Sequence, residues 1–277
     1  LSEAVEADAE EFGSNTTSRA ATQSESKRLR KRIRLHMAEI YGAGQADTLT
    51  ERLLVEAGLK GYKLSIPAVE NKWDERDAVL ITYGDSVMSK DRPPLQSLHD
   101  FLIKRASETF TGVHILPFFP FTSDDGFSIS DYMAVNPELG DWDDIEKIGE
   151  NFKLMSDLVL NHCSSQHLWF KNYLQGQSPG AEYFIEPESG DDFSQVVRPR
   201  SSPLLTKVET IHGERSVWCT FGPDQVDLDF SNPEVLFEVV KILKAYVDKG
   251  IRLFRLDAVA FLWKEAGTTC VHLKQTH

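Results

Sequence analysis

The stretch GIRLFRLDAVAF, residues 250–261, decides the fold class because it sets charged side chains into a run that otherwise predicts a buried β-strand. Side chains alternate between the two faces of a strand, so Arg255 and Asp257 are expected to share one face. Burying a carboxylate costs several kcal/mol unless the group is paired or used chemically. This face is therefore expected to be chemically active or to hold an internal ion pair.

Three earlier apolar runs predict strands of the same buried kind. They are AVLITYGD (78–85), GVHILPFFPF (112–121) and FKLMSDLVLNH (152–162), the last ending in Asn161 and His162. The segments between the runs predict helices over 95–107, 141–152 and 232–249. Strands that alternate with helices indicate parallel βα units joined by right-handed crossovers, which is an α/β fold.

The connection between the third and fourth predicted strands is too long for a helix alone. Residues 163–230 hold aromatic, Pro and Gly residues in irregular order. A loop of this size in a compact fold is usually functional or forms a small inserted domain. It would leave the carboxyl end of the third strand, the edge at which barrel enzymes build their sites. We therefore expect an inserted subdomain over about 163–230.

The composition is that of a globular protein, with 277 residues and a formal net charge of −13. This charge repels phosphate backbones and anionic membranes, so binding to nucleic acid or to a membrane is not expected. Cys163, Cys219 and Cys270 lack the spacing of a metal site or a disulfide framework, which favours a reducing, cytoplasmic location. No apolar run approaches the ~18 residues of a membrane span, and no signal-peptide pattern opens the sequence.

The N-terminal part differs in composition from the rest. Residues 1–26 are acidic and then Ser/Thr-rich, which predicts a disordered leader. Residues 27–77 are expected to form a helical extension, with a second helix over 47–57. The extension begins with the basic run KRLRKRIRL, which could be a targeting or nucleic-acid patch. An apolar stripe from Leu29 to Ile40 favours instead a packed helix with a solvated basic face.

Polar and aromatic residues cluster at the edge where the carboxyl ends of the predicted strands meet. They are Asp124, Asp125 and Phe127 after the second strand, His162 after the third, and Arg255 and Asp257 in the fourth. Each also has an ordinary structural explanation: a turn aspartate, a hydrogen-bonded buried histidine, or a structural ion pair. Their convergence on one rim favours a binding site. Carboxylates, an imidazole and a guanidinium beside aromatic rings suit a sugar, which offers hydroxyl groups and an apolar ring face.

Several spaced motifs carry a resemblance to a known family. DLVLNH (157–162), QVDLD (225–229) and FRLDAVAF (254–261), with GVHILPFFP upstream, resemble the signature regions of glycoside hydrolase family 13, the α-amylase family. Within it, QVDLD together with RPRSSPLLT, WKEAGTTCVHL and DAVLITYGD is similar to the sucrose phosphorylase group, especially members that act on glucosylglycerate or phosphorylated sucrose. The resemblance covers roughly residues 35–277.

The resemblance implies a TIM (β/α)8 barrel, of which residues 78–277 would form about the first four βα units. The family also uses a general acid, a glutamate at the end of the fifth strand, and a His-Asp pair after the seventh. The sequence has no counterpart of these, and 78–277 without the inserted segment suffices for about half of a barrel of ~250 residues. We therefore expect a fragment or partial gene product, inactive alone, whose function is that of a full-length parent.

The resemblance also implies roles for residues of the predicted rim. Asp257 matches the catalytic nucleophile, which attacks the anomeric carbon of an α-glucoside and forms a covalent β-glucosyl ester. Arg255 would hold that carboxylate ionised, because a nearby cation favours the charged form. His162 and Asp124 match residues that hydrogen-bond the outer glucose hydroxyls, and Phe127 matches a ring that stacks beside the sugar.

Phe221 and Arg200, in the inserted segment, match positions near the acceptor. An arginine there can bind phosphate, although Arg200 could also be an ordinary solvated loop residue. In a phosphorylase, phosphate rather than water releases the glucosyl group as α-glucose 1-phosphate. No metal or organic cofactor is implied. Asn161 lies where some amylases bind structural calcium, but it has no further acidic partners in the sequence.

Three hypotheses about function follow. The first is phosphorolysis of sucrose, glucosylglycerate or a related α-glucoside by the full-length parent, with a small carbohydrate and inorganic phosphate as partners. The second is hydrolysis of an α-glucoside by an enzyme of the same family. The third is a non-catalytic carbohydrate-binding or interaction fragment. The identity of the acceptor and the oligomeric state stay open at this stage.

Overall fold

The computed structural model describes residues 26–60 and 73–277, and the chain divides into two compact units, Leu1–Trp73 and Asp74–His277. The leader predicted over 1–26 lies outside the described residues except for its last position, and so does the part of the extension over 61–72. Within the described residues, no helix combines the length and the apolar composition that crossing a bilayer requires.

The first unit contains a helix over 26–41 and helix α2 (Ala46–Glu56). The basic run forms the first of these helices, as its apolar stripe predicts, and Met37 of that stripe is buried. Two arginines on the basic face pair with α2: Arg30 Nε lies 2.6 Å from Glu51 Oε1, and Arg34 Nε lies 2.8 Å from Asp47 Oδ1. The basic run is thus a helix with local acidic partners.

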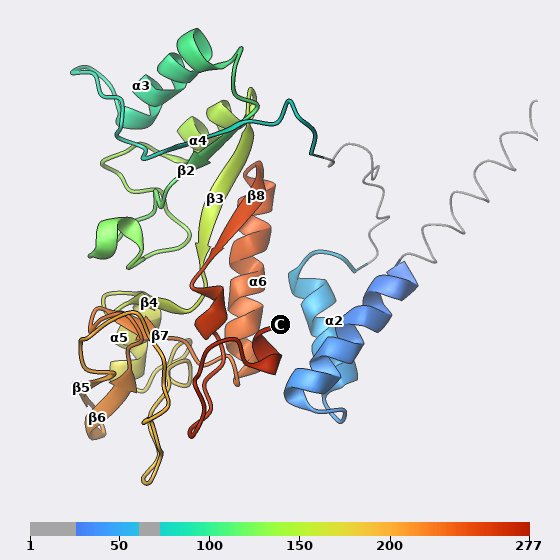
Figure 1. The fold of residues 1–277 in the computed structure, drawn as a ribbon, viewed down its shortest axis with the longest axis vertical. Helices are drawn as coiled ribbons and strands as arrows, with labels where there is room; N and C mark the ends of the chain where they lie inside the picture. Colours follow the sequence, from blue (N-terminus) through green and yellow to red (C-terminus); the bar gives the residue numbers. More distant parts are fainter. Residues whose placement is uncertain (1–25, 61–72) are drawn as a thin grey trace, which may run out of the picture. The chain divides into compact units, whose positions relative to one another are not determined.

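The second unit is built on a four-stranded sheet in which every pairing is parallel. Its strands are β1 (Val79–Thr82), β2 (Gly112–Ile115), β3 (Lys153–Val159) and β8 (Ile251–Asp257), and their spatial order is that of the chain. The connecting helices are α3 (Pro94–Phe101), which continues as a π-helical turn over Leu102–Ala106, α4 (Trp142–Gly149) and α6 (Pro233–Asp248) (Figure 1). This arrangement is that of a partial TIM barrel, as the sequence predicts.

The helix boundaries follow from local chemistry. Asp141 and Asp144 form a capping box at the start of α4, in which each side chain accepts a hydrogen bond from the other residue's backbone N–H. Helix α6 begins at Pro233, and Asn232 caps it: the Asn232 side chain accepts a hydrogen bond from the backbone N–H of Glu234. The core lies between these helices and the sheet, where Leu154 of β3 and Ile145 and Ile148 of α4 are almost fully buried.

The inserted segment contains regular structure of its own (Figure 1). It holds helix α5 (Leu168–Leu174) and a hairpin of β5 (Leu205–Thr210) and β6 (Gly213–Trp218). Two short strands, β4 (His162–Ser164) and β7 (Gln225–Asp227), pair antiparallel. We refer to this segment as the inserted subdomain, because it holds a helix and strands of its own.

One predicted boundary is wrong, and it concerns a site residue. The third barrel strand ends at Val159, so His162 does not lie at its end. His162 instead opens β4 and pairs with Asp227 of β7. Leu160 and Cys163, which follow the end of β3, are also buried. The sequence therefore stays apolar across the boundary, and it predicts a longer strand than the structure has. The chain therefore leaves the barrel sheet without losing its apolar character, and the inserted subdomain holds the histidine.

Candidate active site

The seven residues that the sequence predicts as a site line one cavity of about 290 Å³ at the carboxyl ends of the strands. They are Asp124, Phe127, His162, Arg200, Phe221, Arg255 and Asp257. Three further residues line the same cavity: Tyr83, Asp125 and Gln225. Segments as distant in sequence as the end of β1 and the end of β8 thus contribute to one concave surface that combines charged groups with aromatic rings, as sugar sites do.

Asp257 and Arg255 share one face of β8, as the alternation predicts, and Arg255 Nη1 lies 3.2 Å from Asp257 Oδ1. Arg255 is expected to hold this carboxylate ionised, and its charge does lower the pKa of Asp257, but burial acts more strongly in the opposite direction. Burial raises the pKa of Asp257 above its usual range, and the nearby charge of Arg255 offsets this only in part. Arg255 Nη1 is also 2.5 Å from Asp157 Oδ1 of β3, so its charge is shared between two carboxylates.

His162 is buried, and its Nε2 lies 3.0 Å from the carbonyl oxygen of Phe127. Burial lowers the pKa of the imidazole, which keeps the ring uncharged at neutral pH although Asp227 and Asp257 act in the opposite direction. An uncharged imidazole can donate or accept a hydrogen bond with a sugar hydroxyl. The Phe127 ring also lines the cavity, with the Arg255 guanidinium 5.5 Å from its centroid.

Gln225, which the sequence analysis missed, connects two predicted site residues. Its Nε2 donates to Asp124 Oδ2 at 2.9 Å and lies 3.1 Å from His162 Nε2. Gln225 is the first residue of the motif QVDLD, which was the available signal. A glutamine in a strand does not by itself indicate a binding role. Tyr83 could have been found by applying the strand-end rule to β1 as well as to the later strands.

Arg200 extends into the cavity from the inserted subdomain. Its Nη2 lies 3.8 Å from Asp124 Oδ1, and its guanidinium carbon is 5.9 Å from the Phe221 ring centroid. The side chain is 46% exposed, so a small anion can reach it from solvent. Phe221 in turn lies 5.2 Å from the His162 ring, centroid to centroid. Arg200 is thus a cavity residue rather than a fully solvated loop arginine.

The turn that carries Asp124 is strained and anchored. Asp124 and Asp125 have φ of 57° and 50°, in the left-handed region that non-glycine residues seldom occupy. Gly126 has φ of 105°, and a Cβ there would lie 2.9 Å from Pro117 Cβ. The Asp224 carboxylate anchors the turn by accepting hydrogen bonds from four hydroxyl groups. They belong to Thr122, Ser123, Ser128 and Ser165.

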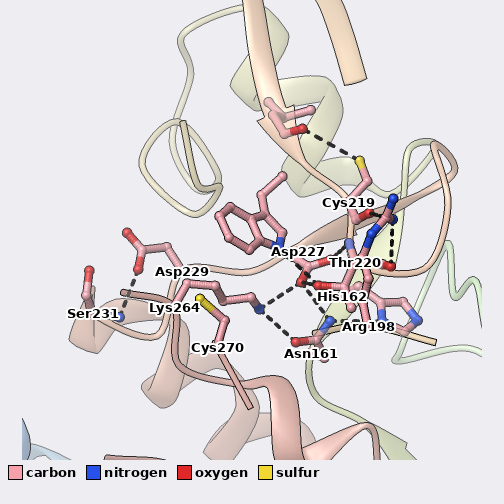
Figure 2. Close-up of polar contacts among 12 residues, drawn as sticks. Asn161, His162, Arg198, Cys219, Thr220, Asp227, Asp229, Ser231, Lys264 and Cys270 are labelled. Atoms are coloured by element: carbon pink, nitrogen blue, oxygen red, sulfur yellow. Dashed lines mark hydrogen bonds and ion pairs between the residues drawn. The ribbon is translucent and has the colours of Figure 1, made fainter. Parts of the chain in front are cut away.

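A buried ion pair lies next to the cavity residue His162 (Figure 2). Lys264 Nζ lies 2.7 Å from Asp227 Oδ2 and donates to Asn161 Oδ1 at 2.7 Å, and both charged side chains are almost fully buried. Thr220 donates to Asp227 through its backbone N–H and its hydroxyl. Asn161 Nδ2 donates to Asp227 Oδ2 at 2.9 Å and lies beside His162. The network joins β7, the end of the barrel strand and the segment after β8.

The side-chain oxygen of Asn161, the atom that a calcium ion would bind, accepts a hydrogen bond from the Lys264 ammonium group. Within residues 26–60 and 73–277, no three His, Cys, Asp or Glu side chains are placed to hold a metal ion together. Asn161 acts here as a hydrogen-bonding bridge between a lysine and a carboxylate.

Comparison with known proteins agrees with the fold and the motifs. Residues 107–275 match the catalytic domain of alpha amylase, and this chain belongs to the α-amylase family, glycoside hydrolase family 13. The matched residues include β2, β3, β8 and the whole inserted subdomain. The partial-barrel architecture and the family resemblance expected from the sequence are both confirmed.

Several of the similar proteins are phosphorylases. The chain is 47% identical to a glucosylglycerate phosphorylase of Allomeiothermus silvanus over 249 residues, which cover 90% of this chain and 44% of that protein. It is 37% identical to a sucrose 6(F)-phosphate phosphorylase of Thermoanaerobacterium thermosaccharolyticum, over 69% of this chain and 41% of that protein. A crystal structure of sucrose 6F-phosphate phosphorylase superposes with a TM-score of 0.67 at 32% identity, covering 75% of this chain and 45% of that one. The chain thus spans less than half the length of these relatives.

Proposed function

We propose that this chain supplies the nucleophile and the glucose-binding residues of a full-length enzyme that performs retaining α-glucosyl transfer to phosphate, with glucosylglycerate, sucrose or a related α-glucoside as donor. One observation carries the proposal: Asp257 opens onto the same cavity as the glucose-facing residues Asp124 and His162 and the exposed cation Arg200. The similarity to glucosylglycerate and sucrose 6(F)-phosphate phosphorylases supports the same reaction class.

Two displacements at the anomeric carbon make up the reaction. A carboxylate oxygen of Asp257 attacks that carbon, the bond to the acceptor oxygen breaks, and a β-glucosyl ester forms. A phosphate oxygen then attacks the same carbon from the opposite face, the ester bond breaks, and α-glucose 1-phosphate leaves. Arg200 binds the phosphate, because a guanidinium donates paired hydrogen bonds to its oxygens. His162 and Asp124 orient the glucose during both steps.

The first displacement also needs an acid that protonates the departing oxygen. Besides Asp257, the carboxylates that line the described cavity are Asp124 and Asp125. Asp124 contacts Gln225 and Arg200. Asp124 and Asp125 both lie in the strained turn. We assign the acid to neither, and we propose that the described units alone do not turn over an unactivated glucoside at a significant rate.

A chimera tests the proposal. This chain would replace the matching segment of the Allomeiothermus silvanus glucosylglycerate phosphorylase, and the formation of glucose 1-phosphate would be followed with glucosylglycerate and with sucrose. We expect release that depends on phosphate. Glucose released at the same rate without phosphate would favour hydrolysis. A folded chimera that binds glucose but turns over neither donor would favour the non-catalytic alternative.

A further inference from the structure

A row of polar side chains crosses the inner face of the barrel sheet and ends at Asp257. His114 of β2 lies with its Nε2 2.8 Å from Asp157 Oδ2 of β3. The other oxygen of Asp157 contacts Arg255 Nη1 of β8, which in turn contacts Asp257. The strand register explains the contact, because Asp157 and Arg255 are direct neighbours in the parallel pairing of β3 with β8.

The two carboxylates in this row are treated differently. Asp157 is fully buried, does not line the cavity, and has a donor on each oxygen. A carboxylate only accepts hydrogen bonds, so His114 Nε2 is the donor of that contact. Asp257 is 17% exposed, opens onto the cavity, and shares with Asp157 the same guanidinium nitrogen at a longer distance. One cation therefore serves two anions, and the anion outside the cavity lies nearer to it.

We propose that Asp157 is a positioning residue that competes with Asp257 for the Arg255 guanidinium, and that His114 holds Asp157 in this role. The inference rests on the proposed function only in taking Asp257 as the nucleophile. A carboxylate neutralised by an arginine of its own is a weak nucleophile, because its lone pairs are engaged. The competition leaves Asp257 only partly compensated, whereas Asp157 keeps Arg255 fixed beside it.

His162 and Asp124 also act on the Asp257 carboxylate. His162 is uncharged at neutral pH, as its burial requires, and Asp124 pairs with Gln225 and Arg200 rather than with Arg255. Arg255 and Asp157 act on the Asp257 carboxylate with opposite signs and contact each other directly. Removing the Asp157 charge should therefore transfer Arg255 to Asp257, and weakening the His114 contact should draw Arg255 further toward Asp157.

Titration of the Asp257 side chain by carbon-13 NMR of the aspartate-labelled chain tests this, with Asp257→Asn identifying the signal. In Asp157→Asn, we expect the pKa of Asp257 to fall by about one unit, a tenfold weaker hold on its proton, as one nearby charge produces. In His114→Leu, which removes the donor, we expect the pKa of Asp257 to rise. His114→Gln keeps an N–H group that can reach Asp157 and should leave the pKa unchanged.

Opposite shifts in the first two variants are the result that a merely structural role would not produce, because general loosening would move both in one direction. An unchanged or raised pKa of Asp257 in Asp157→Asn would overturn the proposal, and so would a shift in the same direction in both variants. If Asp157→Asn does not fold, as judged by circular dichroism, a fall or no change in His114→Leu is enough to reject it. The titration needs no turnover, so its outcome is independent of whether the protein proves to be a phosphorylase.

Discussion

Two carboxylates of the second unit, Asp227 and Asp257, differ in how fully the surrounding residues compensate their charge. Asp227 is fully buried and is met by the Lys264 ammonium, by Asn161 and by two donors of Thr220. Asp257 is partly buried, opens onto the cavity and shares a single guanidinium with another carboxylate. The charge of Asp227 is therefore fully compensated within the fold. The carboxylate of Asp257 can still accept hydrogen bonds or react.

This difference separates structure from function. A fully satisfied buried pair fixes the position of the segments that carry it, but it has nothing left to offer a substrate. A carboxylate whose pKa is raised by burial, beside a cation that only partly offsets this, is the arrangement expected of a reacting group. The comparison predicts that changes at Asp257 act on chemistry and that changes at the Lys264 pair act on stability.

The largest effect is expected for Asp257→Asn in the chimera. The substitution removes the attacking oxygen's charge, so glucose 1-phosphate formation should fall on the order of 10⁴-fold or more. Initial rates with glucosylglycerate and phosphate measure this. The thermal midpoint of the variant should be equal to or slightly above that of the parent chimera, and a loss of activity below tenfold would remove Asp257 from the chemistry.

The next largest effect is expected for Lys264→Met, which leaves Asp227 buried without its cation. Breaking a buried pair from one side costs about 3–5 kcal/mol of unfolding free energy, because the remaining charge is uncompensated. Urea unfolding of the chain measures the loss, and Asp227→Asn added to Lys264→Met should recover part of it.

Lys244 offers a matched control on the surface. Its ion pair with Asp248 lies on the exposed side of α6, and both side chains are well exposed. Lys244→Met should change the unfolding free energy by less than about 1 kcal/mol. Equal losses in the two methionine variants would show that the Lys264 network has no special structural role.

A smaller effect is expected for Arg200→Ala, because Arg200 is exposed and contributes to one step only. The loss of a charge-assisted hydrogen bond, about 1.5–3 kcal/mol, corresponds to a roughly tenfold to hundredfold higher phosphate requirement in the chimera. Release of glucose by water should be spared. Initial rates at varied phosphate concentration distinguish this from a general loss of activity, which would place Arg200 outside the phosphate site.

The smallest effect is expected for the stability of Asp257→Asn as a function of pH. The folded state holds the Asp257 proton more tightly than the unfolded state does, since its pKa is raised. Stability is therefore lost as the pH rises through the interval from the unfolded to the folded pKa. The variant should be slightly more stable than the parent at neutral pH, and this gain should vanish below the unfolded pKa. A variant less stable than the parent at pH 7 would contradict the sign of the shift.

The sequence predicted the barrel units because their signals are local. Apolar runs and cap residues such as Asn232 placed the strands and helices, and alternation along β8 placed Arg255 and Asp257 on one face. The features that the sequence did not predict depend on contacts between distant segments. Local patterns could not show that His162 belongs to β4, because the apolar run crosses the end of β3. Nor could they show that burial outweighs Arg255 in setting the pKa of Asp257.

The site was predicted in its composition but not in its supports. Seven of the ten residues that line the cavity were predicted as site residues from strand ends and motifs. Gln225 and Lys264 were missed as supporting residues because their role depends on partners more than sixty positions away, Asp124 and Asn161 respectively. A buried lysine looks like a surface lysine until the fold brings a carboxylate to it.

The central claim, that Asp257 is a glucosyl-accepting nucleophile, can be tested on the chain itself with α-glucosyl fluoride. Fluoride leaves without protonation, so the reaction requires only the nucleophile and the donor pocket. The account predicts fluoride release and, by mass spectrometry of the quenched protein, a glucosyl group on the peptide that contains Asp257, with both signals absent in Asp257→Asn. Glucosylation at another residue, or equal fluoride release by the folded Asp257→Asn variant, would contradict it.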